Sequence, residues 1–211
     1  MTGGPSAGKT TVIEIIRREF SSVSSTIPEA ASILYQGGFP REMQGVPRSE
    51  ITKCAQRAIY FTQIQMERLF EAIPGKQLIF CDRGTLDHPA YWPESAENFF
   101  QDVKTDLQTE VSRYDFVIHL ETATKEHGYD ASSLIRRENH NEAVTVDKRI
   151  LDSWKDHPRR VIIPSSLSFH EKISTVFQTV EILLKGHPEF QQPAKNLRSK
   201  FMETSSWAAA V

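Results

Sequence analysis

The sequence has little of what marks several large classes of protein. It contains two cysteines, Cys54 and Cys81, without metal-ligand spacing, which excludes a disulfide framework and predicts buried thiols in a reducing compartment. It contains no run of eighteen apolar residues and no charged-then-apolar leader, so neither a membrane-spanning helix nor secretion is predicted. We therefore expect a cytoplasmic protein.

Charge of one sign is also not in excess. The 25 lysines and arginines are balanced by 27 aspartates and glutamates, which gives a formal net charge of -2. This balance does not indicate a surface for polyanions, and no nucleic-acid partner is expected. With 211 residues, 39% of them hydrophobic, the chain is long enough to bury a core without disulfides or a structural metal.

The most informative motif begins at the third residue. Residues 3 to 10 read Gly-Gly-Pro-Ser-Ala-Gly-Lys-Thr, which fits the phosphate-loop pattern G-x-x-x-x-G-K-[ST]. The glycines let backbone N–H groups turn toward phosphate oxygens, the lysine reaches the β- and γ-phosphates, and the threonine hydroxyl ligates Mg²⁺. A flexible glycine-rich terminus is the less favoured alternative, because helix-type apolar spacing follows directly. The predicted ATP-binding residues are Gly3, Gly4, Pro5, Ser6, Ala7, Gly8, Lys9, Thr10 and Thr11.

A phosphate loop normally follows a hydrophobic strand, and here only Met1 and Thr2 precede it. We therefore expect the first, central strand of the sheet to be missing. An N-terminal truncation or a late start codon is favoured over a sheet that lacks a central strand. A truncated, inactive form is accordingly one alternative for the whole chain.

Apolar patterns predict alternating strands and helices. Short apolar runs bounded by turn residues predict strands at 78–81, 116–120 and 161–163, and more weakly at 23–27. Helical spacing predicts helices over 11–20, 51–73, 96–107, 143–154 and 168–184, the last opened by a capping box. With the phosphate loop, this alternation predicts a three-layer αβα P-loop NTPase fold with a parallel sheet. Residues 1–186 form this domain, and 187–211 are expected to be a loosely held tail that could dock on a protein partner.

An acid and a base follow the strand predicted at 78–81. The carboxyl edge of a parallel sheet is where ligands bind, so Asp82 is placed to hold Mg²⁺ or to accept a proton. Arg83 is placed to hold a phosphate or carboxylate of a second substrate. A strand-end salt bridge would be the better explanation without the phosphate loop. ATPases of the AAA class usually carry a glutamate where Arg83 stands, which favours transfer to an acceptor over hydrolysis.

Several motifs together resemble one family. They are the phosphate loop, Pro28-Glu-Ala-Ala31, Cys81-Asp-Arg-Gly-Thr-Leu-Asp87, Tyr114-Asp115, His119-Leu-Glu121 and the spaced residues Arg136, Glu138, Asp147 and Trp154. The sequence is similar to small P-loop proteins described as AAA-type ATP-binding domains, which are related to the nicotinamide riboside kinase domain. The resemblance extends to about Lys172 and implies an adenine-nucleotide-binding, kinase-like fold without fixing the acceptor.

The acceptor side is assigned to four residues and a lid. Glu29 matches the family's Pro-Glu-Ala and would serve acceptor recognition or Mg²⁺, although a helix-start glutamate favoured by the dipole is equally expected. Gln63, Arg83 and Asp87 are assigned to acceptor binding, with a solvated helix face as the stronger alternative for Gln63. The long polar stretch 122–141 predicts a lid that delivers Arg136 to the transferring phosphate. Lys9, Asp82 and Arg136 are therefore the catalytic candidates.

The leading functional hypothesis is an ATP- and Mg²⁺-dependent phosphotransferase acting on a small nucleoside- or nucleotide-like acceptor. Thr10 and Asp82 are the expected Mg²⁺ ligands. The alternative is a nucleotide-dependent switch or ATPase that binds a protein or lipid partner. A GTPase form has no support, because Thr124-Lys-Glu-His127 lacks the aspartate of the guanine-reading motif.

Overall fold

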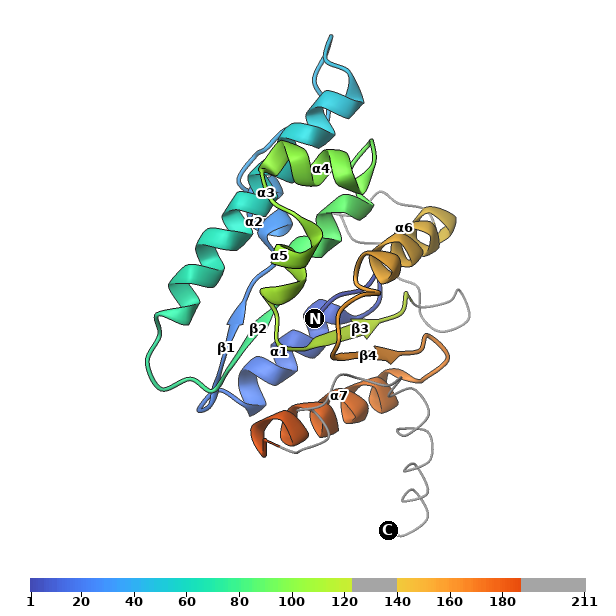
Figure 1. The fold of residues 1–211 in the computed structure, drawn as a ribbon. Helices are drawn as coiled ribbons and strands as arrows, with labels where there is room; N and C mark the ends of the chain where they lie inside the picture. The colour runs from blue at the N-terminus through green and yellow to red at the C-terminus, as the bar shows by residue number, and fades with distance from the viewer. Residues whose placement is uncertain (123–139, 187–211) are drawn as a thin grey trace.

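The structure, a computed structural model, describes residues 1–122 and 140–186 (Figure 1). Most of the stretch expected to form a lid, including Arg136, and the whole tail 187–211 lie outside the described residues. No described helix is long and apolar enough to cross a membrane.

Within residues 1–122 and 140–186, four short strands lie in two parallel pairs. β1 (Ser24–Ile27) pairs with β2 (Leu78–Cys81), and β3 (Val117–Leu120) pairs with β4 (Arg160–Ile163). These strands confirm the predicted positions, including the weakest. β2, β3 and β4 are short, mostly apolar runs, whereas β1 reads Ser-Ser-Thr-Ile and has one apolar residue. Figure 1 shows the N-terminus between the two pairs, with β2 on one side and β3 on the other.

Met1 and Thr2 join the two pairs. The Met1 amino group donates to the carbonyl of Cys81 at 2.8 Å, and the Arg83 N–H donates to the Met1 carbonyl at 2.9 Å. On the other side, Thr2 forms a parallel bridge with His119. In the described part of the chain, the central position of the sheet is therefore occupied by two residues only. This agrees with the expectation that the first strand is missing.

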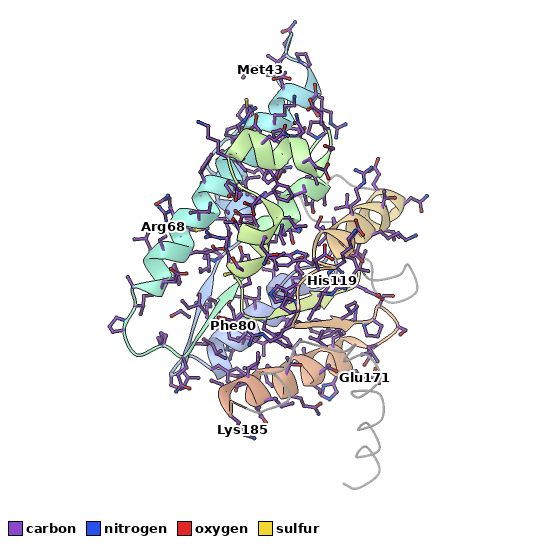
Figure 2. All side chains as sticks on the ribbon, viewed as in Figure 1. Met43, Arg68, Phe80, His119, Glu171 and Lys185 are labelled. Atoms are coloured by element: carbon purple, nitrogen blue, oxygen red, sulfur yellow. The ribbon has the colours of Figure 1, made fainter. Side chains whose placement is uncertain are left out.

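Helices cover both faces of the sheet. α1 (Lys9–Glu19) and α7 (Phe169–Leu184) bury apolar side chains against one face, together with Phe80, Ile118 and Leu120. The other face is covered by α3 (Arg48–Glu71), α5 (Leu107–Ser112) and α6 (His140–Ser153), with α2 (Ala30–Gln36), α4 (Ala96–Val103) and the 3₁₀-helix η1 (Thr85–Ala90) beside them. Figure 2 places Phe80 and His119 inside the molecule, whereas Arg68 and Glu171 lie at its periphery. The α/β class with helices on both faces is confirmed.

The helix predicted over 96–107 is two helices. α4 ends at Val103, because Lys104 takes a left-handed conformation with φ 59°. α5 then begins after Asp106, whose side chain accepts the Thr109 N–H at 2.7 Å. The single-helix prediction was wrong because the apolar spacing continues across this break. The capping box of α7 is confirmed, with Ser168 and Glu171 bonded reciprocally.

The buried face of α3 also differs from the apolar stripe. Leu69 and Ile73 continue the apolar spacing, yet Leu69 is 69% exposed and Ile73 lies beyond the helix end. Gln63 and Glu67 are buried instead. Glu67 accepts hydrogen bonds from the Tyr114 hydroxyl and the Arg113 guanidinium, which satisfies its carboxylate inside the domain. The solvated face favoured for Gln63 is therefore wrong.

Gly3 sits where the phosphate loop passes β3, and its φ of 131° disfavours any side chain. A Cβ on Gly3 would lie 2.0 Å from the Leu120 carbonyl oxygen, whereas one on Gly38, also at positive φ, would meet nothing within 4 Å. We expect Gly3→Ala to lower the free energy of unfolding by about 3 kcal/mol or more and Gly38→Ala by about 1 kcal/mol. Urea unfolding of both variants measures the difference. Equal losses would show that Leu120 does not confine this loop.

Candidate nucleotide and acceptor site

The loop Gly3–Thr10 curves between the sheet and α1. Gly3 and Gly8 have positive φ, and Ser6 also lies in the left-handed region at φ 59°. Alternation of this kind turns successive N–H groups to one side, which is the geometry of an anion-binding nest. Gly8 then caps α1, so the positive end of that helix adds to the loop.

Lys9 points back into the loop. Its Nζ donates to the carbonyls of Gly3 at 2.9 Å and Gly4 at 2.7 Å, and the side chain is buried. Burial, with the nearby Arg83 guanidinium, lowers the pKa of Lys9 to about 7. An ammonium group in this position lacks an anionic partner at hydrogen-bond distance among the described residues, and phosphate oxygens would supply one.

Asp82 and Thr10 form a small oxygen-donor set at the carboxyl end of β2. The Thr10 hydroxyl donates to Asp82 Oδ2 at 3.3 Å, while the buried Oδ1 has no hydrogen-bond partner among the described atoms. Burial raises the pKa of Asp82 against the opposing effect of Lys9. Mg²⁺ prefers one or two protein oxygens together with water and phosphate, and these residues fit it. The described residues contain no group of three or more His, Cys, Asp or Glu side chains that could hold a metal ion.

Arg83 joins three elements beside the phosphate loop. Its backbone adopts a left-handed conformation with φ 75°. Its Nε donates to Glu29 Oε1 at 2.5 Å, and its Nη1 donates to Asp87 Oδ2 at 3.1 Å and, more weakly, to the Gly3 carbonyl at 3.4 Å. The guanidinium thus joins the end of β1, the end of β2 and the phosphate loop.

Glu29 stands at the start of α2 and stays ionised. Burial would raise the pKa of its carboxyl, but the Arg83 guanidinium and the Ser32 hydroxyl, which donates at 2.5 Å, outweigh burial and lower the pKa to about 2. The side chain is one-fifth exposed, so a ligand can reach it. A carboxylate held in this way can accept a hydrogen bond from a substrate hydroxyl.

A cavity of about 120 Å³ adjoins this pair. Pro5 of the phosphate loop forms part of its wall, and Glu29 and Arg83 form another part. A wider hollow of about 530 Å³ lies beside this cavity, and four residues line both spaces. The shared residues are Tyr35, Arg41, Gln56 and Tyr91.

The predicted acceptor residues are only partly brought together. Glu29, Arg83 and Asp87 line the cavity, although Asp87 is also bonded to the Thr2 hydroxyl and the Trp154 indole. Gln63 does not line it, since its amide donates to Glu67 inside the domain. Arg136 lies outside the described residues, and its role stays a prediction.

Sequence reasoning assigned no site role to Gln56, His88 or Asp147, although Asp147 is one of the residues that carry the family resemblance. Gln56 and His88 share a 2.8 Å hydrogen bond in the cavity wall, and Gln56 precedes Gln63 by two helical turns on α3. Asp147 of α6 accepts the Gly4 N–H at 2.6 Å and the Thr122 N–H at 3.0 Å. Asp147 therefore holds the phosphate loop in place. It lies on α6, the helix that follows the stretch expected to form a lid. For Gln56 and Asp147 the available signal was a polar residue next to the apolar positions of a helix.

His88 makes stability depend on pH. Burial lowers the pKa of its imidazole to about 4 from an ordinary value near 6.5. Between these pH values the unfolded chain binds a proton that the folded chain does not, so the free energy of unfolding falls by about 3 kcal/mol as the pH drops from 6.5 to 4. The variant His88→Gln has no titrating group at this position, so its free energy of unfolding should fall by about 3 kcal/mol less over the same pH range.

Urea unfolding at several pH values compares the two proteins directly. His157, whose pKa is also lowered by burial, is present in both and cancels in the comparison. Parallel pH profiles for the wild type and His88→Gln would contradict a buried, neutral His88.

The loop, the strand-end aspartate and the parallel sheet define a nucleotide-binding P-loop domain with a kinase-like fold. The chain belongs to the AAA domain family, which matches residues 1–172. Among solved structures, the fold is similar to that of deoxyadenosine kinase from M. mycoides with bound dATP. The TM-score is 0.54 at 14% sequence identity, and the match covers 85% of this chain and 96% of that one. A comparison with curated proteins found no match.

Proposed function

We propose that this protein is an ATP-dependent phosphotransferase that acts on a hydroxyl group of a small nucleoside- or nucleotide-like acceptor. The observation that carries the proposal is the cavity beside the phosphate loop, whose wall contains Pro5 together with the Glu29–Arg83 pair. An enzyme that only hydrolyses ATP needs a water-activating group, but it does not need a second binding space at this point.

The phosphate side is assigned to the loop and to Lys9. Loop N–H groups and the end of α1 would hold the β- and γ-phosphates. Lys9 would exchange the carbonyls of Gly3 and Gly4 for phosphate oxygens and neutralise charge on the transferring group. Thr10 and Asp82 would hold Mg²⁺, which when bound supplies further charge neutralisation at the phosphates.

The acceptor side is assigned to Glu29 and Arg83. Phosphoryl transfer passes through a loose transition state, so orienting the hydroxyl matters more than removing its proton early. This suits Glu29, because a carboxyl with a pKa of about 2 is a weak base but a fixed hydrogen-bond acceptor. Arg83 holds Glu29 in place and lies near enough to bind an anionic group of the acceptor.

Acceptor-dependent ADP formation tests the proposal. The purified protein is given ATP and Mg²⁺ with a panel of nucleosides, nucleotides and vitamin ribosides, and ADP release is measured for each. We expect at least one compound to raise ADP release well above the rate with ATP alone. If no acceptor changes the rate of ADP release, and a protein or lipid partner binds in a nucleotide-dependent way, the result would favour a switch instead.

A further inference from the structure

The cavity beside the phosphate loop is too small to hold a whole acceptor. Its volume is about 120 Å³, whereas sites for small molecules usually enclose about 300–1,000 Å³. The hollow of about 530 Å³ beside it falls within that range, and Tyr35, Arg41, Gln56 and Tyr91 line both spaces. An acceptor whose hydroxyl lies near Glu29 therefore extends into the hollow.

Three arginine side chains from three elements line the hollow. Arg41 lies in the chain between α2 and α3, Arg48 begins α3, and Arg149 lies on α6. Segments far apart in the sequence thus bring three guanidinium groups to one concave surface. Such convergence suits the recognition of phosphate, because each planar guanidinium offers parallel N–H donors that match phosphate oxygens.

None of these three arginines forms an ion pair within residues 1–122 and 140–186. On the same helix as Arg48, by contrast, Arg57 pairs with Asp102 at 2.6 Å. Glu42 and Glu142 also line the hollow, and each of them has another interaction of its own. Three guanidinium groups against two carboxylates leave the hollow with an excess of positive charge.

The cavity end differs from the hollow in its charge balance. Its Arg83 guanidinium pairs with two carboxylates, Glu29 at 2.5 Å and Asp87 at 3.1 Å. Glu29 is ionised at neutral pH, since its pKa is about 2. An anionic group of the acceptor would bind Arg83 only in competition with these carboxylates, whereas the arginines of the hollow have no such competitor.

The guanidinium of Arg41 is held against an aromatic ring. Its central carbon lies 3.5 Å from the centre of the Tyr35 ring, so the guanidinium lies over the ring face. A guanidinium held by its flat face keeps its in-plane N–H groups for a ligand. Tyr35 and Arg41 line both spaces, which places this donor where the cavity meets the hollow.

One side of α3 gives the distance between the two ends. Arg48, Thr52 and Gln56 follow one another at four-residue spacing, and all three line the hollow. With a rise of about 1.5 Å per residue, Arg48 lies about 12 Å along the helix from Gln56, which also lines the cavity. An anionic group bound near Arg48 is therefore remote from the reacting hydroxyl.

We propose that the acceptor is a phosphate monoester with its free hydroxyl and its phosphate at opposite ends, the phosphate being bound in the hollow by Arg41, Arg48 and Arg149. This inference rests on the proposed function and names the class of its acceptor. The hydroxyl lies at Glu29, and the body of the molecule lies along the wall that both spaces share. A phosphate fits better than a carboxylate, because it carries about two negative charges and three oxygens for three guanidinium groups.

The product would then carry two phosphate groups. The hydroxyl oxygen bonds to the γ-phosphorus, the bond from that phosphorus to the β–γ bridging oxygen breaks, ADP leaves and the hydroxyl proton is released to water. The phosphate in the hollow takes no part in these bonds, so it contributes to binding and orientation alone.

Binding of matched compounds tests the site without relying on transfer. The phosphate loop is filled with Mg²⁺ and a non-hydrolysable ATP analogue, and calorimetry then measures the Kd of nucleoside monophosphates, nucleosides, ribose 5-phosphate and ribose. We expect at least one phosphate monoester to bind at least tenfold more tightly than the same compound without its phosphate. Equal affinities within every pair, or no binding by either member of any pair, would overturn the proposal.

Substitutions in the hollow locate the phosphate. Arg48 and Arg149 are exposed, so Arg48→Gln and Arg149→Gln should fold as the wild type does. Each should weaken binding of the preferred phosphate monoester about tenfold and leave the Kd of its phosphate-free parent within about twofold. The matched control is Arg68→Gln, which removes an exposed arginine from the last turn of α3, at the periphery of the molecule and outside the hollow (Figure 2). Equal weakening by Arg68→Gln would show that binding follows net charge alone and would overturn the proposal.

Transfer assays separate this inference from the proposed function. With a phosphate monoester as acceptor, Arg149→Gln should raise the KM about tenfold and keep kcat within a few-fold, because the group that Arg149 binds does not react. If neutral nucleosides are phosphorylated with the same kcat/KM as their monophosphates, the phosphate site is overturned and the phosphotransferase stands. If phosphate-dependent binding occurs without any transfer, the site stands and the phosphotransferase is overturned.

Discussion

Lys9→Met is expected to reduce phosphoryl transfer at least 10³-fold while leaving the Tm of the nucleotide-free protein unchanged or higher. The loss follows from removing the only cation of the phosphate loop, which the account assigns to the developing charge on the γ-phosphoryl group. The retained stability follows from burial, which lowers the pKa of Lys9 to about 7 and so makes its charge a cost to the folded protein. Single-turnover kinetics and thermal unfolding measure the two effects on one preparation.

Lys76→Met is the matched control. Lys76 also donates to a backbone carbonyl, that of Ser21 at 2.7 Å, but lies away from the phosphate loop. It should keep transfer within a few-fold of the wild type. A Lys9→Met protein that transfers phosphate at the rate of Lys76→Met would exclude Lys9 from the chemistry.

Glu29→Gln is expected to lower kcat by about 10²- to 10³-fold with a smaller change in the KM for ATP. The amide keeps the size of the side chain but loses the charge that pairs with Arg83. In the proposed mechanism the same charge holds the acceptor hydroxyl. Because the pKa of Glu29 is about 2, the wild-type rate should not fall through its protonation at any pH where the protein stays folded. Steady-state kinetics with a competent acceptor measures both parameters.

Ser32→Ala removes the hydroxyl that donates to Glu29 and keeps the Glu29 carboxylate itself. The Ser32 hydroxyl donates to Glu29 Oε2 at 2.5 Å, so its loss leaves the charge and the Arg83 pair in place. We expect less than a tenfold decrease in kcat. If Glu29→Gln were no slower than Ser32→Ala, Glu29 would not orient the acceptor.

Much of the fold could be predicted because its signals are local. The strand Leu78–Cys81 is an apolar run between Pro74-Gly75 and Asp82, and the structure reproduces its bounds. The start of α7 follows from the Ser168–Glu171 capping box, which needs no tertiary partner. The phosphate loop is likewise encoded within eight residues, and the family match confirms its class.

What could not be predicted depends on contacts between distant elements. Glu67 is buried because Arg113 and Tyr114 satisfy it from 46 and 47 positions away. Gln56 enters the cavity wall because His88 of η1 packs against α3. In each case a polar residue on a helix is buried by a partner that no periodicity reveals.

Of the residues predicted for acceptor binding, Glu29, Arg83 and Asp87 line one cavity, whereas Gln63 does not. Glu29 and Arg83 follow β1 and β2 directly, and parallel strands bring their carboxyl ends to one edge. Gln63 was assigned to the same site from its place on a helix, but the rotation of α3 points it into the domain.

The most direct test is transfer of label from γ-labelled ATP, with the acceptor panel separated and counted after reaction. The account predicts that label appears covalently on at least one nucleoside- or nucleotide-like acceptor with the wild-type protein and is lost with Lys9→Met. Label found only in inorganic phosphate, with ATP bound and every acceptor unlabelled, would contradict a phosphotransferase.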